Sequence, residues 1–553
     1  MAPENTIATD TDTDVLIIGG GPTGLTLALE LSLQQIPFRI IDSSPSRSPY
    51  SRAFAIHARS LELLSRHPDI IPALISRGTF NLSVKLFSNN TPIFEIHLQD
   101  TPFADTAFPG PLFVSQAITE EVLDAALGKY GGSAVEWGVK ATEVEQDESG
   151  VSVALQRSDG KDTDREFETI RAKYVVGCDG AHSIVRKSSG LSFEGGAYPQ
   201  DFILADVRMR WEFKANLHIF IGHYGLLAAL PLGDGIFRLV CSRPFERDSE
   251  EEPTLEDFRS AIKQHVPGTV EISDPVWMTR FRLHHRIASS YRKGRCFLAG
   301  DAAHIHSPAG GQGMNTGIQD SVNLGWKLAT VLRGESPDPE LLLDSYHLER
   351  HKVGVAILRG TDRVFEIMAT TNPVVLFLRD RLVPWIVPWI LGDRERRRVR
   401  MRFISQLGIR YRESPIVGNS RTWEGKLRGG NRAADGKLGR PGLDPGADDE
   451  TTLIGLLKGP GYHLFLFSGV GENAVGMEEM GDVERALVDG NESVTVHRIL
   501  HGAEKSGNGF IDVGGNLHGA YGFERPGFVL VRPDGYIAFI GYTEEMDGPL
   551  TLA

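Results

Sequence analysis

Residues Gly294 to Gly317, GRCFLAGDAAHIHSPAGGQGMNTG, combine an apolar run, an acid and a glycine-rich loop in one segment. The run from Cys296 to Ala299 predicts a short buried strand that ends at Gly300-Asp301. The loop that follows contains Pro308 and three glycines and leads into a helix. Such a loop leaves backbone N–H groups uncovered at a helix N-terminus, where the helix dipole favours negative charge. An acid at the strand end can hold a polyol hydroxyl, and the small residues let a flat ring lie against the backbone.

A second glycine motif lies near the N-terminus. The run from Val15 to Gly19 predicts a buried parallel strand, and Gly19, Gly21 and Gly24 then follow the pattern G-x-G-x-x-G at the start of a helix. The first glycine permits a tight turn, the second lets a pyrophosphate approach, and the third lets helix and strand pack closely. Asp42 ends the next strand, 18 residues after Gly24, where it can accept a hydrogen bond from a ribose hydroxyl. Together the two glycine segments predict a flavin dinucleotide site.

Three further segments appear in a characteristic order. They are SRAFAIHARSLELL (Ser51 to Leu64), Gln116 followed by Thr119-Glu120, and YVVGCDGAHSIVRK (Tyr174 to Lys187). With the two glycine segments, this order resembles the class A flavin-dependent aromatic hydroxylases, the phenol hydroxylase-like and 4-hydroxybenzoate hydroxylase-like family. The resemblance covers roughly residues 14–415.

The resemblance implies a role in FAD binding for particular residues. Arg52 would lie by the pyrophosphate, and Asp179 would serve both the pyrophosphate and a transiently bound NAD(P)H. Gln116 would contact the flavin phosphate or ribityl region, and Asp301 would bind the ribityl chain. Gly313, Met314 and Asn315 would lie against the isoalloxazine ring. The predicted cofactor-binding set is Gly19, Gly21, Gly24, Asp42, Arg52, Gln116, Asp179, Gly300, Asp301, Pro308, Gly313, Met314 and Asn315.

The resemblance also implies a reaction. NAD(P)H would reduce FAD, O2 would form a C4a-hydroperoxide on the flavin, and a phenolic aromatic substrate would be hydroxylated, with polyketide-type secondary metabolites among the candidate substrates. Epoxidation, Baeyer–Villiger insertion, oxidative rearrangement and a non-oxygenating FAD reductase remain open as alternatives. Some phenol hydroxylases use an acid in the segment that here runs from Arg52 to Leu61, but this chain has none there. We consider His57, His223 and Tyr224 as candidate substrate-contacting residues. His304 and His306 have no convincing metal-ligand spacing, so we predict no metal and assign them to loop hydrogen bonds.

The length of 553 residues predicts several domains. We expect an α/β fold: a Rossmann-like FAD-binding domain, an interleaved mixed or antiparallel substrate sheet, and a C-terminal thioredoxin-like domain without CxxC. The expected boundaries are a disordered N-terminus (1–13), a monooxygenase region (14–415) with substrate segments at about 82–113 and 195–285, a linker (416–450) and the C-terminal domain (451–553). The alternating run at Val151 to Leu155 is assigned to the substrate sheet, and Leu341 to Leu407 is predicted to be helical.

Composition restricts the partners and the compartment. The net charge of −14 argues against nucleic acid and anionic membranes as partners. Three cysteines without a CxxC motif, and an N-terminus without a targeting pattern, indicate a reducing compartment, the cytoplasm. The apolar stretch from Val374 to Leu391 contains Arg379, Asp380 and Arg381, so we predict that it does not span a bilayer. Packing in the core is favoured for it over contact with a membrane surface or a dimer partner. The C-terminal domain is expected to be structural or to form a homodimer.

Overall fold

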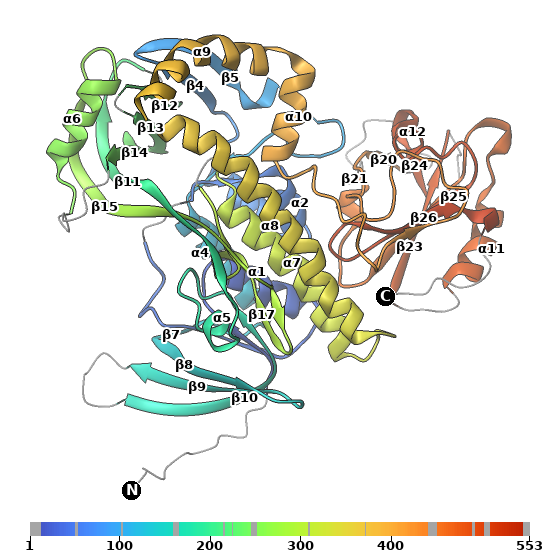
Figure 1. The fold of residues 1–553 in the computed structure, drawn as a ribbon. Coiled ribbons are helices and arrows are strands. Elements are labelled where there is room, and N and C mark those ends of the chain that lie inside the picture. Colours follow the sequence, from blue (N-terminus) through green and yellow to red (C-terminus); the bar gives the residue numbers. More distant parts are fainter. Residues whose placement is uncertain are drawn as a thin grey trace, which may run out of the picture.

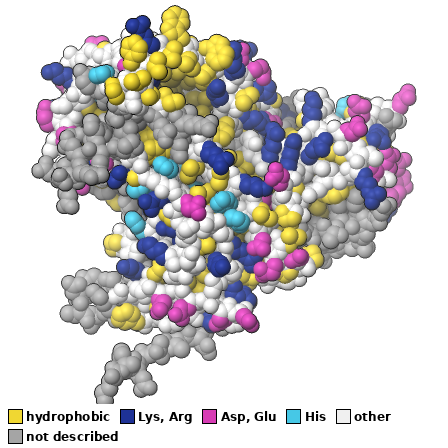
Figure 2. All heavy atoms as spheres, viewed as in Figure 1, with side chains coloured by type: hydrophobic (Ala, Val, Ile, Leu, Met, Phe, Trp, Pro, Cys, Tyr) yellow, Lys and Arg dark blue, Asp and Glu magenta, His cyan; other side chains and the backbone are white. Residues whose placement is uncertain are grey.

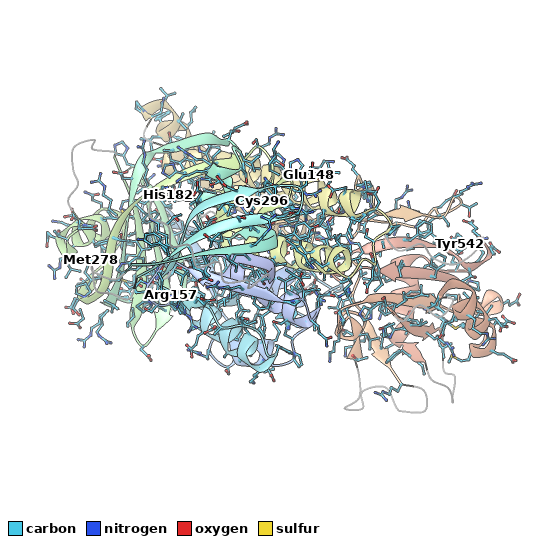
Figure 3. The ribbon with its side chains drawn as sticks, turned by 90° about the horizontal axis from the view of Figure 1, so that it is seen from below. Glu148, Arg157, His182, Met278, Cys296 and Tyr542 are labelled. Atoms are coloured by element: carbon cyan, nitrogen blue, oxygen red, sulfur yellow. The ribbon has the colours of Figure 1, made fainter. Side chains whose placement is uncertain are left out.

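The computed structural model describes residues 13–49, 53–100, 103–158, 165–213, 216–223, 225–244, 252–307, 310–370, 372–440, 451–488, 493–502 and 509–545. Three parts are visible in Figure 1: a central α/β domain, a second sheet above it, and a C-terminal domain to one side. In the perpendicular view, Met278 of the second sheet and Tyr542 of the C-terminal domain lie toward opposite ends, with Cys296 of the central domain between them (Figure 3). The predicted disordered N-terminus lies outside the described residues, except that Thr13 begins the first strand.

The central domain has a parallel sheet with the order β16-β17-β10-β1-β2-β7, in which only the short edge strand β16 runs antiparallel to its neighbour. Its strands are β1 (Thr13–Ile18), β2 (Phe38–Asp42), β7 (Glu136–Trp137), β10 (Arg165–Gly177), β16 (Arg292–Lys293) and β17 (Cys296–Leu298). Helix α1 (Pro22–Leu33) connects β1 to β2, and α7 (Gly313–Leu332) follows the loop after β17. Because the middle strands are buried on both faces, they are continuously apolar. The Rossmann-like prediction is confirmed.

The first half of β10 extends this sheet with an antiparallel ribbon. Strands β8 (Val139–Gln146) and β9 (Val151–Ser158) pair with each other, and β9 pairs with β10. The assignment of Val151 to Leu155 to the substrate sheet is therefore wrong. Alternation identified the strand correctly, but it carries no information on which sheet a strand joins.

The second sheet has the order β18-β15-β11-β14-β13-β12-β4-β5 and is antiparallel except for the pair of β12 and β4. Its strands are β4 (Ser83–Ser88), β5 (Thr91–His97), β11 (Phe193–Arg210), β12 (Leu217–Gly222), β13 (Gly225–Gly233), β14 (Ile236–Pro244), β15 (Glu271–Ala288) and β18 (His304–Ile305). The expected second, largely antiparallel sheet interleaved with the FAD-binding domain is thus present. Helix α6 (Leu255–His265) packs against one face. Strand β18 belongs to the loop after β17, so this loop joins the two sheets directly.

Three helices follow α7, as predicted: α8 (Pro339–Ala369), α9 (Pro373–Gly392) and α10 (Arg394–Ile404). The expectation that the apolar stretch in α9 packs in the core is wrong. Only Leu376 and Arg379 are buried in this helix, whereas Trp385 is 78% exposed and Trp389 is 64% exposed. Every helix in the described part of the chain is too short or too polar to pass through a membrane.

The C-terminal domain is built around a mixed sheet with the order β19-β26-β25-β22-β23-β24-β20-β21. Its strands are β19 (Gly418–Asn419), β20 (Lys437–Gly439), β21 (Thr451–Thr452), β22 (Tyr462–Phe467), β23 (Val494–Leu500), β24 (Phe510–Asp512), β25 (Gly527–Val531) and β26 (Ile537–Tyr542), with helices α11 (Met477–Val488) and α12 (Asn516–Tyr521). A parallel pair, β22 and β23, lies beside the antiparallel hairpin of β25 and β26. This β-α-β unit followed by a hairpin is the arrangement that a thioredoxin-like domain implies.

The predicted linker at 416–450 is wrong for its described part, residues 416–440. Strands β19 and β20 lie in this segment and pair with the C-terminal sheet, and Trp423 and Leu438 belong to that domain's core. Some of the glycines that suggested a loop instead lie where two backbone segments pack closely. A Cβ on Gly429 would lie 2.5 Å from the carbonyl oxygen of Gly418. The C-terminal domain therefore begins near Gly418.

Candidate active site

The carboxyl ends of three adjacent parallel strands, β1, β10 and β17, bring the glycine motifs together. Gly19, after β1, has φ of +117°, and a Cβ there would lie 2.2 Å from the carbonyl oxygen of Cys178, after β10. The N–H of Cys178 donates to Ile18 (2.7 Å), and the N–H of Ala299, after β17, donates to Gly177 (3.0 Å). Open α/β sheets bind ligands at this edge. The motifs at Gly19, Asp179 and Gly300 are thus parts of one site.

Thr23, in the first turn of α1, is the point where the fingerprint meets the loop after β17. A Cβ on Gly300 would lie 2.5 Å from Thr23 Oγ1, and a Cβ on Gly317 of α7 would lie 2.3 Å from the same atom. Gly300 also has φ of +61°, which favours glycine. The Thr23 side chain therefore fills the space where a Cβ on either glycine would lie.

In the described part of the chain, the first turns of α1 and α7 are without side-chain caps. A Cβ on Gly24 would lie 1.9 Å from the carbonyl oxygen of Gly19, so this glycine is required for packing, whereas a Cβ on Gly21 would meet nothing within 4 Å. Among the described residues, no side chain caps either helix, and neither first turn carries an acid. Two uncapped helix N-termini beside an open glycine fit the pyrophosphate and the negatively charged edge of a flavin.

Asp42 orders the fingerprint turn. Its Oδ2 accepts a hydrogen bond from the N–H of Gly20 (2.8 Å), and its Oδ1 accepts one from the N–H of Ser44 (2.8 Å). A carboxylate has about four acceptor positions. The two that remain allow the predicted bond to a ribose hydroxyl.

Asp179 offers an unfilled hydrogen-bonding position. Its Oδ2 accepts from the N–H of Ile184 (2.7 Å), whereas its buried Oδ1 has no partner among the described residues. Burial raises the pKa of Asp179. Arg186, from the same motif, donates to the carbonyl oxygens of Ala302 (2.8 Å) and Ala181 (2.7 Å), which ties this motif to the loop after β17. An unpartnered buried oxygen beside the fingerprint turn fits a cofactor that supplies the missing partner.

Asn315, at the start of α7, joins the loop to the segment predicted to contact the cofactor. Its Oδ1 accepts from the N–H of His57 (2.7 Å), and its Nδ2 donates to the carbonyl oxygens of Ala55 (3.0 Å) and Gly311 (2.9 Å). The side-chain amide is therefore committed to the protein backbone, and any contact of Asn315 with the flavin ring is left to its backbone. Gly313 and Met314 precede it and are half-buried.

His57 is buried and bound to the same loop. Its Nε2 lies 2.7 Å from the carbonyl oxygen of Gly310, which can only accept, so Nε2 carries the proton. Nδ1 is then an acceptor, and it is buried without a partner among the described residues. Burial lowers the pKa of His57 to about 4, so the ring is neutral at neutral pH.

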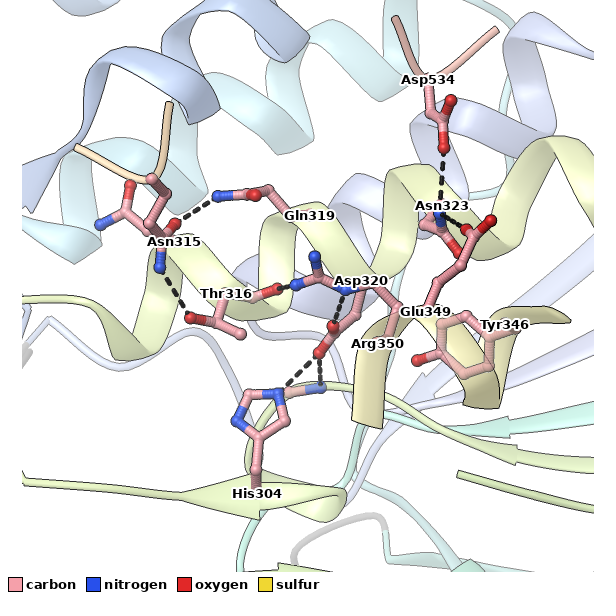
Figure 4. A network of polar contacts seen from close by, with 12 residues as sticks. His304, Asn315, Thr316, Gln319, Asp320, Asn323, Tyr346, Glu349, Arg350 and Asp534 are labelled. Atoms are coloured by element: carbon pink, nitrogen blue, oxygen red, sulfur yellow. Dashed lines mark hydrogen bonds and ion pairs between the residues drawn. The ribbon is translucent and has the colours of Figure 1, made fainter. Parts of the chain in front are cut away.

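A buried ion network connects the loop to α7 and α8 (Figure 4). Asp320 of α7 is fully buried; its Oδ2 accepts from the N–H of Gly300 (3.0 Å) and pairs with His304 Nε2 (2.7 Å). Its Oδ1 accepts from Nε of Arg350, on α8 (2.6 Å). Burial alone would raise the pKa of Asp320, but Arg350 and His304 lower it below its usual value. His304 is therefore a loop-ordering residue, as predicted.

The network continues into the C-terminal domain. Asn323 Nδ2 donates to Asp534, in the β25–β26 hairpin (2.9 Å), and to Glu349 of α8 (2.7 Å). Glu349 is also paired with Arg532 (2.6 Å) and Lys327 (2.9 Å). Burial would raise the pKa of Glu349, but these two cations lower it, while burial lowers the pKa of Lys327 to about 8. The C-terminal domain is thus bound to the helix that begins at the candidate flavin site.

Sequence reasoning missed this network. The residues Asp320, Asn323 and Lys327 have the spacing i, i+3, i+7, which places them on one face of α7. Polar residues at this spacing normally indicate a solvated face, but α7 is buried on all sides. The sequence signal that could have revealed this buried network is the presence of acidic and basic residues on a helix that also carries a complete apolar stripe.

For the other predicted site residues, the structure gives a position but no contact that indicates a role, or does not describe them. Gln116 begins α4 (Gln116–Lys129); its Oε1 accepts from the N–H of Ala53 (3.4 Å), so it borders the Arg52 segment. Asp301 and His223 are exposed. Arg52, Pro308 and Tyr224 lie outside the described residues. Within the described ranges, no group of three His, Cys, Asp or Glu side chains could hold a metal ion.

Comparison with known proteins identifies the family. Residues 12–361 match the family described as FAD binding domain. The chain is 32% identical over 542 residues to the 6-methylpretetramide 4-monooxygenase of Streptomyces rimosus, covering 95% of this chain and 90% of that protein. The chain belongs to the FAD-dependent aromatic monooxygenases. This monooxygenase is equally similar to the pentachlorophenol 4-monooxygenase of Sphingobium chlorophenolicum, at 32% identity over 97% of this chain and 95% of that protein.

Solved structures agree with this assignment. The anhydrotetracycline hydroxylase OxyS from Streptomyces rimosus superimposes with a TM-score of 0.73 at 29% identity, covering 97% of both chains. The fold class, the enzyme class and FAD as cofactor are therefore confirmed for this monooxygenase. The assignments of individual FAD-contacting residues remain predictions.

Proposed function

We propose that this monooxygenase uses NAD(P)H and O2 to hydroxylate a polycyclic, polyketide-type phenol. The observation that carries the proposal is the convergence of the Gly19, Asp179 and Gly300 motifs at one sheet edge, next to a second sheet joined to it through β18. Two of the relatives named above are a 6-methylpretetramide monooxygenase and an anhydrotetracycline hydroxylase, which supports a polycyclic substrate. A simple phenol is the alternative, supported by the pentachlorophenol relative.

When bound and reduced by NAD(P)H, FAD would supply the electrons that activate O2; one atom of O2 would go to the substrate and the other would leave as water. The chain's own residues bind and orient. Gly21 would give the pyrophosphate room, Asp42 would accept a hydrogen bond from the ribose, and the unpartnered Oδ1 of Asp179 would accept one from the cofactor. The backbone N–H groups at Gly313 to Asn315, at the positive end of α7, stabilise negative charge on the flavin ring.

The proton of the substrate's hydroxyl group needs an acceptor. No carboxylate occurs from Arg52 to Leu61, and His57, with a pKa of about 4, is a weak base. Its neutral ring would orient the substrate by accepting a hydrogen bond at Nδ1, and it would not remove the substrate's proton at neutral pH. We therefore propose that the substrate is acidic enough to lose this proton to water, which favours phenols with extended conjugation or a neighbouring carbonyl group.

The test is NADH and NADPH oxidation by the FAD-loaded enzyme with simple phenols, naphthols and tetracyclic polyketide-type phenols. Oxygen uptake and H2O2 are followed in parallel. The proposal expects that a polycyclic phenol accelerates oxidation with little H2O2. Acceleration only by simple phenols would contradict the substrate class. Oxidation that never depends on an aromatic substrate would contradict oxygenation and favour a reductase.

The compartment and assembly remain proposals. The three cysteines, Cys178, Cys241 and Cys296, are free, which supports a reducing compartment, and we propose the cytoplasm. The homodimer expected from the sequence also remains a proposal, and the oligomeric state of the wild type and of W385S/W389S tests it.

A further inference from the structure

Helix α9 buries an arginine and exposes most of its large apolar side chains, although Leu376 is buried and Arg381 is exposed. Its buried side chain Arg379 donates to the carbonyl oxygens of Gly222 (2.6 Å) and Met368 (2.8 Å). Its large apolar side chains face outward instead. The apolar stripe of α9 consists of Val374 (66% exposed), Phe377 (62%), Leu378 (49%), Leu382 (48%), Trp385 (78%), Ile386 (43%) and Trp389 (64%). Contiguous exposed apolar surface of this kind marks an interaction site.

Helix α10 places positive charge directly after this stripe. From Arg394 to Arg402 there are six arginines and one glutamate, a local net charge of 6 − 1 = +5 in a chain whose total is −14. Arg394, Arg398 and Arg400 are exposed, and the guanidinium of Arg396 stacks 4.1 Å from the ring centroid of Trp389. Figure 2 shows the apolar side chains gathered at the top of the molecule, over α9, with Lys and Arg side chains beside them.

We propose that the apolar stripe of α9 and the arginines of α10 dock this monooxygenase onto an anionic lipid surface. Tryptophans at an apolar–polar boundary beside a basic surface are the features of helices that lie in the plane of a membrane interface. Each arginine near an anionic leaflet adds attraction. The helix would lie on the membrane and not cross it, in agreement with its two internal prolines and its central charges.

The same charges disfavour a second copy of the chain as the occupant. A two-fold dimer through the α9 stripe would bring the same patch of both chains together. The two sets of α10 arginines would then lie close to each other and repel. The chain's overall negative charge does not oppose lipid docking through this face, because exposed charges farther away than about 10 Å are largely screened at moderate ionic strength.

Docking through α9 would place the second sheet next to the membrane. Helix α9 packs against β4 and β5 of that sheet, and Arg379 fixes it to the end of β12. An apolar substrate dissolved in the lipid would then lie on the side of the enzyme that carries the proposed substrate domain. The docking itself does not depend on the proposed reaction.

The experiment is co-sedimentation of the full-length, FAD-loaded protein with vesicles of phosphatidylcholine, alone or with phosphatidylserine, at low and moderate salt. The variants are W385S/W389S and R398Q/R400Q. The matched control is F167S, which removes an equally exposed aromatic side chain (68%) on β10. Circular dichroism and flavin absorbance verify that each variant is folded and loaded.

The expected result is binding to phosphatidylserine vesicles that weakens with salt and is unchanged in F167S. Since each arginine near the surface contributes about fivefold, R398Q/R400Q should bind roughly thirtyfold more weakly. W385S/W389S should remain in the supernatant. Wild-type protein that stays in the supernatant at low salt, or W385S/W389S that binds as the wild type does, would overturn the proposal. A dimer that W385S/W389S dissociates, without vesicle binding, would instead assign the stripe to a second copy.

Discussion

Asp320 provides a quantitative test of how the loop after β17 is held in place. The substitution D320N removes a fully buried charge and leaves the guanidinium of Arg350 buried without its ion-pair partner. Breaking a buried pair from one side costs about 3–5 kcal/mol. If the amide oxygen of the introduced side chain faces Arg350, its NH2 group faces the N–H of Gly300 and Nε2 of His304. An NH2 group cannot accept a hydrogen bond, so both of these donors lose their acceptor. We therefore predict a loss of about 3–5 kcal/mol in the free energy of unfolding, together with weaker FAD binding.

The assay is urea denaturation of the apoprotein followed by circular dichroism, with FAD binding measured by flavin fluorescence. The control is D482N, which removes an exposed ion pair with Arg485 and should cost less than about 1 kcal/mol. In a double-mutant cycle, D320N/R350M should be less destabilised than the sum of the single variants, because no unpaired buried charge remains. A loss below 1 kcal/mol in D320N, or strict additivity in the cycle, would refute the proposed network.

Three further predictions concern other parts of the site. G24A should destabilise the protein by about 1–3 kcal/mol or more, because its Cβ has no space. G21A should fold normally, because its Cβ meets no protein atom, but it should bind FAD roughly tenfold or more weakly, because this Cβ would enter the space predicted for the pyrophosphate. Equal stability losses in the two variants, measured by urea denaturation, would contradict this difference. His57 has a pKa near 6.5 in the unfolded chain and about 4 in the folded protein, so lowering the pH across this window should reduce the free energy of unfolding by about 3 kcal/mol. H57N should remove this part of the pH dependence of stability. An unchanged pH profile of stability in H57N would contradict the prediction. R532M should lower the free energy of unfolding by about 3–5 kcal/mol, because the buried Glu349 loses an ion-pair partner. An R532M variant that unfolds at the same temperature as the wild type would show that this contact between the domains does not contribute to stability.

The sequence predicted the parts of this protein whose signal is local. Gly19, Gly21 and Gly24 lie on a strand–turn–helix with the steric roles that their spacing implies, and the loop at Gly300 enters a helix without a cap, as expected. These features depend on backbone geometry within a few residues, so a short motif specifies them.

The missed features depend on partners that are distant in the sequence. The side-chain amide of Asn315 is bonded to a segment 258 residues away, at His57, and nothing in the local sequence indicates this partner. The exposure of Trp385 and Trp389 could not be predicted, because an apolar run does not reveal whether anything covers it. The segment 416–440 looked like a linker because glycines in close backbone contacts have the same composition as glycines in loops.

The central claim is that this chain transfers one atom of O2 to an aromatic ring at the edge where β1, β10 and β17 end. The most direct measurement is turnover of the FAD-loaded enzyme under 18O2 with NAD(P)H and the phenol that best stimulates oxidation, followed by mass spectrometry of the product. The account predicts that the product carries one labelled oxygen atom, and that G21A, although folded, forms less of it until excess FAD is added. A product that carries oxygen only from water, or an unchanged substrate with all consumed oxygen recovered as H2O2, would contradict it.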